Sequence, residues 1–420
     1  MNATQLSGKR VLVVGLARSG NAAAAVLVGR GADVVAFDRD EAVGVGRLLE
    51  LGVEVHTGRE EEKLLQGTDL VVKSPGVPGE TRLVAGARRR GIPVWSEVEL
   101  GAQLLPNPLL GVTGTNGKTT TSELLGEVFR AADRPVEVAG NVGRPLTSLV
   151  GVARPDTWIV CELSSFQLED VETLNPEIGI LLNLEPDHLD RHGSLESYSD
   201  AKLRIFERQS SEDTAVVPRG FGTVPGAGRR AEFDAADELP AEPLIPGSHN
   251  RENAAAATVA ARAAGIPDEA IAKGLRTFPG VPHRIELVRE LRGVRYVNDS
   301  KATNVAAALR ALASFPGSRL HVILGGRGKA ESYESLAAAF GSGDRGYLIG
   351  ESAQEIADAF GSAGVSYSAA GSLVVALAEA TASARAGDVV LLSPACASFD
   401  QFEDFEARGD EFRRLVEALS

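Results

Sequence analysis

Leu109-Leu-Gly-Val-Thr-Gly-Thr-Asn-Gly-Lys-Thr-Thr120 is the stretch that decides the fold of this 420-residue chain. Its apolar start is typical of a buried strand, and its glycine-rich end runs into a helical pattern. A glycine turn between a strand and a helix forms a phosphate loop, which binds phosphate through backbone N–H groups and a lysine. Val112 stands where the common pattern has its first glycine. We nevertheless predict ATP binding, because Lys118 has little structural use in such a turn. The predicted ATP-binding residues are Gly114, Thr115, Asn116, Gly117, Lys118, Thr119 and Thr120.

Short apolar runs alternate with helical patterns on both sides of this loop. That alternation is typical of parallel sheets covered by helices, so we predict an α/β fold. Proline clusters at 106–108 and 279–282 interrupt it. We therefore expect a Rossmann-like domain at 1–97, a central domain like the phosphate-loop ATPases at 98–281, and a Rossmann-like domain at 282–420. Within the second domain, residues 218–246 lack a strong period and are expected to form a surface excursion.

The composition excludes several classes of protein. Hydrophobic residues make up 44% and charged residues 24%, as in globular domains and unlike disordered, collagenous or coiled-coil chains. The net charge of −14 disfavours a nucleic-acid partner. The two cysteines, Cys161 and Cys396, lack the spacing of a disulfide framework or a zinc site. No apolar run is long enough to span a bilayer, so we expect a cytoplasmic protein without membrane insertion, and we take it to be a monomer.

A second glycine motif lies near the N-terminus. Gly15-Leu-Ala-Arg-Ser-Gly20 follows a strand-like run, and Asp38 ends the next run. The pattern resembles a dinucleotide fingerprint, but Ala17 occupies the position where close approach to a pyrophosphate requires glycine. We favour a nucleotide-like ligand over nicotinamide, and a tight turn without a ligand remains an alternative.

Acidic side chains follow two strand-like runs of the central domain. Glu162 ends one run and precedes Ser164, so a magnesium ligand and a helix cap are equal alternatives on these residues alone. The polar run at 183–192, which includes His188, holds more ionisable groups than a turn needs. Beside a phosphate loop it predicts a metal or phosphate site.

Two helix-like segments add single polar residues. Lys202 lies among apolar residues at helical spacing and is by default a solvated surface lysine. Asn253 lies near the start of another helix, where it suits contact with a ligand's base or ribose. Helix capping remains the alternative for that segment.

Polar loops follow three strand-like runs of the last domain. Residues 298–304 combine one acid, one base and two hydroxyls, which suits an amino acid or phosphoryl oxygens. Residues 325–329 and 393–402 form the other two loops. Because carboxyl ends of parallel strands meet at one sheet edge, we expect an anion-binding edge there.

These motifs together resemble the Mur ligases of peptidoglycan synthesis. The resemblance is carried through all three domains by Gly114–Thr119, Glu162–Gln167, Asp187–Asp190, His249-Asn250, His283-Arg284 and Asn298–Asn304. It is greatest to the member that joins D-glutamate to UDP-N-acetylmuramoyl-L-alanine. The resemblance implies an ATP-dependent ligase, in which an acyl phosphate forms before the amide and the third domain closes onto the second.

The resemblance also implies roles for single residues. Catalytic roles fall to Lys118, His188 and Lys202. Two Mg²⁺ ions are implied at Thr119, Glu162, His188 and Lys202, with the lysine carried as a carbamate. Nucleotide contacts fall to Asn253, Arg284 and Asp299. The substrates UDP-N-acetylmuramoyl-L-alanine and D-glutamate are expected at Leu16, Arg39, Ser74, Gly76, Asn141, His188, Lys301, Thr303, Lys329, Ser398, Phe399 and Phe405.

Three alternatives stay open. One is another Mur ligase, or a ligase like folylpolyglutamate synthase, with a different acceptor. The second is a binding protein that hydrolyses ATP without forming an amide. The third is a nicotinamide dehydrogenase, suggested only by the motif at 15–20.

Overall fold

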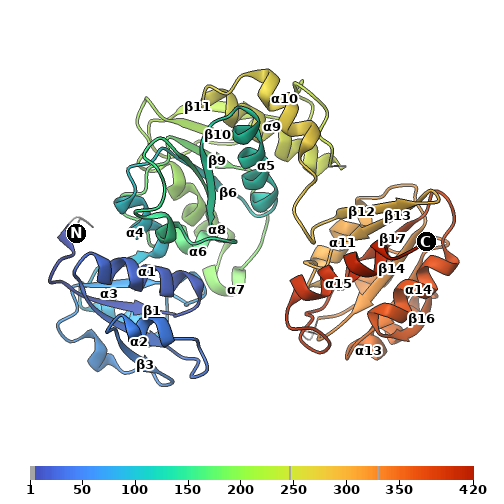
Figure 1. The fold of residues 1–420 in the computed structure, drawn as a ribbon, viewed down its shortest axis with the longest axis horizontal. Helices are drawn as coiled ribbons and strands as arrows, with labels where there is room; N and C mark the ends of the chain where they lie inside the picture. Colours follow the sequence, from blue (N-terminus) through green and yellow to red (C-terminus); the bar gives the residue numbers. More distant parts are fainter. Residues whose placement is uncertain (1–4, 246, 329–330) are drawn as a thin grey trace. The chain divides into compact units, whose positions relative to one another are not determined.

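The computed structural model describes residues 5–245, 247–328 and 331–420. It holds three sheets, each within one stretch of the chain (Figure 1). The contacts divide the chain into two compact units, Met1–Pro243 with Ser248–Phe278, and Leu244–Gly247 with Pro279–Ser420. Each sheet lies inside one of the three predicted domain ranges, and the ranges themselves stay a prediction. Within the described part of the chain, no helix is long and apolar enough to cross a membrane.

The first sheet has five parallel strands in the order β3-β2-β1-β4-β5. They are β1 (Arg10–Val14), β2 (Asp33–Asp38), β3 (Glu54–Thr57), β4 (Leu70–Lys73) and β5 (Val94–Ser96). Its helices are α1 (Arg18–Gly29), α2 (Gly46–Glu50), the 3₁₀ turn η2 (Glu62–Leu65) and α3 (Arg82–Arg89). Strand β1 is buried on both faces, which explains its unbroken apolar sequence.

The second sheet has six parallel strands in the order β11-β10-β9-β6-β8-β7. They are β6 (Leu109–Thr113), β7 (Val136–Gly140), β8 (Trp158–Glu162), β9 (Ile178–Leu181), β10 (Thr214–Pro218) and β11 (Arg229–Phe233). Its longer helices are α4 (Glu97–Leu104), α5 (Lys118–Ala131), α8 (Leu195–Leu203), α9 (Ser248–Ala263) and α10 (Asp268–Thr277). Shorter turns are η3 (Leu146–Leu149), α6 (Ser165–Leu168), α7 (Leu189–His192) and η4 (Arg204–Phe206). Strand β6 pairs with β8 and β9, so the phosphate loop leaves from the interior of the sheet.

The third sheet has the order β12-β13-β17-β14-β15-β16, with β12 antiparallel and the other strands parallel. The strands are β12 (Glu286–Leu291), β13 (Val294–Asn298), β14 (Leu320–Gly325), β15 (Arg345–Ile349), β16 (Ser366–Gly371) and β17 (Val389–Leu392). The helices are α11 (Val305–Ala313), α12 (Glu334–Ala338), α13 (Ala353–Ala363), α14 (Leu373–Ser383) and α15 (Phe405–Glu417). The predicted α/β class with three parallel-type sheets is confirmed.

Two buried carboxylates join the first two sheets within their common unit. Glu97 and Glu99 stand on α4, which follows β5 directly, and both are fully buried. Glu97 Oε1 accepts hydrogen bonds from the backbone N and the hydroxyl of Thr147, each at 2.6 Å. Glu99 accepts from Thr173 N at 2.9 Å and from Leu174 N at 3.0 Å. These contacts fix α4 against loops of the second sheet. The same burial raises the pKa of Glu97 to about 7.

Candidate active site

The phosphate loop between β6 and α5 has the backbone that its glycines allow. Gly114 and Gly117 have φ of +153° and +83°, values that side-chain-bearing residues rarely adopt. Lys118 begins α5, and its Nζ donates to the carbonyls of Gly114 at 2.8 Å and Thr115 at 2.9 Å. The lysine is therefore folded back over the loop that precedes it. This is the arrangement expected where a lysine reaches phosphates held at a helix N-terminus.

Lys202 is not a surface lysine, so the default prediction was wrong. It lies on α8 with 2% of its area exposed, and its Nζ donates to the carbonyl of Gly114 at 2.7 Å. The ammonium also lies 4.6 Å from the ring centre of Tyr198, whose hydroxyl donates to Thr115 Oγ1 at 3.0 Å. Burial, and then the nearby charge of Lys118, lower the pKa of Lys202 to about 7. This burial therefore favours the neutral amine.

Glu162 stands at the end of β8, beside the phosphate loop that follows β6. Its side chain is buried and accepts a hydrogen bond from Asn141 Nδ2 at 3.0 Å. Glu162 is not the helix cap, because Ser164 caps α6 in a capping box with Gln167. Thr119, in the first turn of α5, is also buried. A carboxylate and a hydroxyl thus stand at the carboxyl ends of adjacent strands, which suits oxygen ligation of Mg²⁺.

The two histidines of the 183–192 run have different surroundings. His192 is bound on both ring nitrogens, Nδ1 at 3.1 Å from Glu169 Oε1 and Nε2 at 3.0 Å from Ser165 Oγ. His188 has φ of +52° and a half-exposed side chain. Its ring packs on Phe166 with 4.9 Å between centroids, and its Nε2 lies 3.6 Å from Asp187 Oδ2. Of the two, His188 is the one that a ligand from outside can reach. The described residues contain no group of three His, Cys, Asp or Glu side chains placed to hold a metal ion.

Asn253 lies against the phosphate loop. It is buried on α9, and a Cβ atom added at Gly117 would meet its Oδ1 at 2.2 Å. Gly117 is therefore required by close packing as well as by its backbone angle. The structure brings Asn253 together with the phosphate loop, although the two are far apart in the sequence.

A cavity of about 410 Å³ lies at the carboxyl edge of the first sheet and reaches residues of the loop after β7. Four of the predicted substrate residues line it, Arg39, Ser74, Gly76 and Asn141. Leu16 does not line it, because its side chain is buried in the core. Residues of the predicted motif at 15–20, among them Gly15 and Ser19, also line it, whereas Pro75, Val77, Pro78, Thr81 and Pro145 were not predicted. The cluster of prolines and glycines after β4 was the signal that could have identified this wall.

In the second unit, the predicted residues gather on loops that follow β13 and β17. Asp299 is buried, and its carboxylate accepts from Ser393 Oγ at 2.8 Å and from Ile285 N at 3.2 Å. Burial raises the pKa of Asp299 to about 7. The ammonium of Lys301 lies 5.6 Å from the ring centre of Phe405.

The other predicted amino-acid contacts differ in exposure. In the loop after β17, Ser398 is buried and Phe399 is 62% exposed. Thr303 is partly buried just before α11. Lys329 lies outside the described residues.

Arg408 is a buried charge for which the sequence predicted no role. It stands on α15 with 1% of its area exposed. Its guanidinium donates to Ser300 Oγ at 3.0 Å, to the Ser300 carbonyl at 2.9 Å and to the Cys396 carbonyl at 3.2 Å. Burial lowers its pKa to about 10. The arginine therefore ties the loop after β13 to the loop after β17.

The chain has a phosphate loop on a parallel sheet and two further sheets with polar residues at their carboxyl edges. This combination is typical of multidomain α/β enzymes that use ATP. Three family descriptions match: the Mur ligase MurD-like N-terminal domain over residues 9–96, the Mur ligase middle domain over 112–221, and the Mur ligase glutamate ligase domain over 283–396. A protein of Acidobacterium capsulatum named UDP-N-acetylmuramoylalanine--D-glutamate ligase is 42% identical, with 98% of this chain and 97% of the relative covered. One of the same name from Myxococcus xanthus is 42% identical, with 99% of both chains covered. The chain belongs to the Mur ligase family, and the predicted family and ligase class are confirmed.

Solved structures of the family share this fold at low sequence identity. UDP-N-acetylmuramate-alanine ligase MurC of Thermotoga maritima matches with a TM-score of 0.59 and 19% identity, covering 98% of this chain and 99% of that one. MurF ligase of Thermotoga maritima, solved in complex with ADP, matches with a TM-score of 0.58 and 17% identity, covering 99% and 97%. At these identities the likeness concerns the fold alone.

Proposed function

We propose that this chain joins D-glutamate to UDP-N-acetylmuramoyl-L-alanine at the expense of ATP, in the cytoplasmic synthesis of peptidoglycan precursors. The observation that carries the proposal is the convergence of Lys118 and Lys202 on the carbonyl of Gly114, inside a phosphate loop bordered by the buried Glu162. The names of the near-full-length relatives supply the acceptor and the donor.

The reaction needs activation because a carboxylate is a poor acyl donor. The alanyl carboxylate attacks the γ-phosphorus of ATP, which gives an acyl phosphate and ADP. The amine of D-glutamate then attacks the acyl carbon, the amide bond forms, phosphate leaves, and the amine loses a proton. Charge develops on the transferring phosphoryl oxygens, where Lys118 is the nearest fixed cation of the loop.

The chemistry of the side chains fits magnesium. Glu162 offers a buried carboxylate and Thr119 a buried hydroxyl, both hard oxygen donors. When bound, Mg²⁺ neutralises phosphate charge and orients the transferring group. We assign His188 to the same region because it is the accessible histidine of its run.

The surroundings of Lys202 favour a carbamate over an ammonium group at this position. Carbon dioxide reacts with a neutral amine, and burial keeps much of this amine neutral near pH 7. A carbamate would replace a buried cation beside Lys118 with an anion whose oxygens suit Mg²⁺.

Substrate contacts are proposed for each unit separately. The cavity at Arg39, Ser74, Gly76 and Asn141 takes the uridine diphosphate part. Leu16 supports its wall through the backbone N–H, which donates to Asp38 Oδ2 at 2.5 Å. Nucleotide contacts are assigned to Asn253 in the first unit and to Arg284 and Asp299 in the second. D-glutamate is assigned to Lys301, Thr303, Lys329, Ser398, Phe399 and Phe405. The chain is further proposed to act as a monomer.

The test is phosphate release from Mg-ATP with UDP-N-acetylmuramoyl-L-alanine, comparing D-glutamate, L-glutamate, L-lysine and meso-diaminopimelate, with mass spectrometry of the product. We expect release and a new amide with D-glutamate only. Turnover with another acceptor would move the protein to a sibling ligase. ATP hydrolysis without an amide would favour a nucleotide-binding protein.

A further inference from the structure

The turn that carries Arg284 has an unusual backbone. Its two neighbours, His283 and Ile285, have φ of +62° and +47°. Side-chain-bearing residues rarely adopt this left-handed region, and a β-branched residue such as isoleucine does so least readily. Two such residues around one arginine persist only where surrounding contacts over-determine the conformation.

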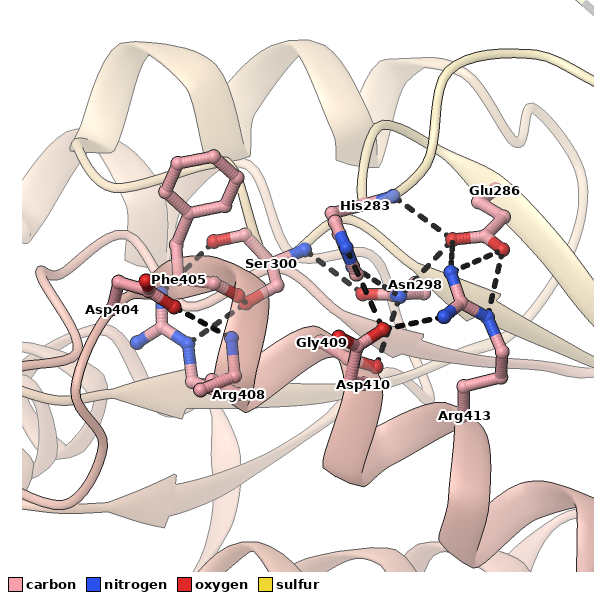
Figure 2. A network of polar contacts seen from close by, with 11 residues as sticks. His283, Glu286, Asn298, Ser300, Asp404, Phe405, Arg408, Gly409, Asp410 and Arg413 are labelled. Atoms are coloured by element: carbon pink, nitrogen blue, oxygen red, sulfur yellow. Dashed lines mark hydrogen bonds and ion pairs between the residues drawn. The ribbon is translucent and has the colours of Figure 1, made fainter. Parts of the chain in front are cut away.

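Asn298 supplies the contacts on the inner side of this turn (Figure 2). It is fully buried at the end of β13. Its Nδ2 lies 3.0 Å from His283 Nδ1, 3.1 Å from Glu286 Oε2 and 3.2 Å from the carbonyl of Gly409. An amide nitrogen only donates, so its two hydrogens are shared among these three acceptors, and His283 Nδ1 accepts in this contact. One amide group thus holds the His283 ring, the strand that follows the turn, and helix α15.

Gly409 closes the same arrangement from α15. A Cβ atom added there would lie 2.1 Å from His283 Nδ1, closer than any real contact. Only glycine lets the helix approach the ring while the ring accepts from Asn298. The glycine is therefore required by the position of His283, not by its own backbone.

Glu286 and the loop after β13 hold the two ends of the turn. Glu286 Oε2 accepts from His283 N at 2.9 Å, and Arg413 Nη2 contacts both oxygens of the same carboxylate at 2.9 and 3.1 Å. On the other side, Lys301 N donates to the carbonyl of His283 at 3.0 Å. The turn is therefore fixed to β12, to α15 and to the loop after β13 at once.

We propose that Asn298 is a positioning residue, which together with Gly409 holds the His283–Ile285 turn in its left-handed conformation. The turn in this conformation positions Arg284 to bind a nucleoside triphosphate. The inference rests on the proposed function for the ligand of Arg284. An arginine on an exposed loop would lose side-chain and backbone freedom on binding phosphate, and the preformed turn removes the backbone share of that cost.

The test uses Asn298→Asp in the full-length chain. The carboxylate keeps an acceptor for Ser300 N, but it faces His283 Nδ1, Glu286 and the Gly409 carbonyl with no donor. We expect the KM for ATP to rise at least about tenfold, the size expected for a misplaced charged hydrogen bond. The KM for UDP-N-acetylmuramoyl-L-alanine should stay within twofold, because its cavity is lined by residues of the other unit only.

A double-variant cycle separates positioning from general damage. If Asn298 acts through Arg284, then Asn298→Asp adds little to the ATP KM of Arg284→Ala. Additive effects, or equal rises in the KM of all three substrates, would overturn the proposal. An ATP KM that Arg284→Ala leaves unchanged would exclude the positioning role of Asn298. Absence of amide product from the wild-type protein would instead overturn the proposed function.

Gly409→Ala keeps the test valid if Asn298→Asp does not fold. This substitution removes no polar group, but its added methyl group displaces the His283 ring. The same selective rise in the ATP KM is therefore expected. An unchanged ATP KM in folded Gly409→Ala would also overturn the proposal. Arg414→Gln is the matched control, because it opens an exposed ion pair with Glu411 on the same helix.

Discussion

Two lysines share one acceptor at the centre of the candidate site. Lys118 and Lys202 both donate to the carbonyl of Gly114, although they come from different helices. Two ammonium groups this close repel each other, and the more buried one gives up its charge more readily. The pKa of Lys202 is accordingly lowered to about 7. The two lysines therefore differ in electrostatics, which is the basis for the different roles proposed for them: charge from Lys118 and an amine from Lys202.

Replacing Lys118 with alanine removes the cation that the loop holds over its own carbonyls. We expect acyl phosphate formation to fall by at least about a hundredfold, as when one stabilising donor of a developing anion is deleted. Trapping of the acyl phosphate with hydroxylamine measures this step directly. Lys273→Ala, an exposed lysine on α10, is the control. Activity near that of the unchanged protein would contradict the assignment.

Lys202 is tested by two substitutions that separate a carbamate from a cation. Lys202→Ala should lose activity and recover part of it when formate or acetate is added, because a small carboxylate can occupy the place of the carbamate oxygens. Lys202→Arg keeps the charge but cannot form a carbamate, so we expect it to be as inactive as the alanine variant. The measurement is amide formation, with chloride at matched ionic strength as the control. High activity of the arginine variant would exclude a carbamate.

The roles of residues that depend on local sequence could be predicted, whereas the roles of residues that depend on burial could not. Gly114, Gly117 and Lys118 follow from one strand-turn-helix pattern, because their roles depend on neighbours in the chain. The burial of Lys202 and Arg408 depends on contacts with distant segments, which one sequence does not report. Their chemistry therefore became visible only in the structure, or through family resemblance.

At the scale of elements, the helix α4 is the connection that makes the first two sheets one unit. Its buried Glu97 carries a pKa of about 7 against an ordinary value of 4.5, and burial is the main cause. The folded state therefore holds a proton that the unfolded state releases between those two pH values. By linkage, the free energy of unfolding falls as pH rises through this window and levels off above about 7.

Glu97→Gln removes this titration and leaves an acceptor for Thr147. Between about pH 4.5 and 7, we expect the free energy of unfolding of the wild-type protein to fall by up to about 3 kcal/mol relative to that of the variant, from the size of the pKa shift. Urea unfolding of both proteins across that range measures the difference. Glu50→Gln, at an exposed position of α2, should show parallel curves. Parallel curves for Glu97→Gln would contradict a raised pKa.

Element prediction succeeded for buried strands and failed at one sheet edge. Strands such as β1 and β6 are apolar on both faces, so their sequences stand out. The predicted surface excursion at 218–246 instead contains β11 at the edge of the second sheet. Its sequence, Arg229-Arg-Ala-Glu-Phe233, is mostly polar and only its last residue is buried, and an edge strand needs only one neighbour. Strands β12 and β13 are joined by Arg292-Gly293, a two-residue turn with positive φ at both positions.

At the scale of the whole molecule, three sheets are shared between two compact units with separate hydrophobic cores. The first unit holds the phosphate loop and the cavity at Arg39 and Ser74. The second unit holds Arg284, Asp299 and the residues assigned to D-glutamate. Because one sequence does not report how sheets group into compact units, the three-domain division stays a prediction.

Two compact units predict two unfolding transitions in calorimetry of the full-length chain, and a ligand stabilises only the unit that binds it. The cavity for UDP-N-acetylmuramoyl-L-alanine is lined by residues of the first unit alone. At a free concentration of about 100 times Kd, this ligand should stabilise that unit by about 2.7 kcal/mol and leave the other transition in place. Arg39→Ala, which removes a charged residue from the lining, should reduce the shift, whereas Arg414→Gln in the second unit should not. A single transition that moves as a whole would mean that the two cores unfold as one cooperative unit.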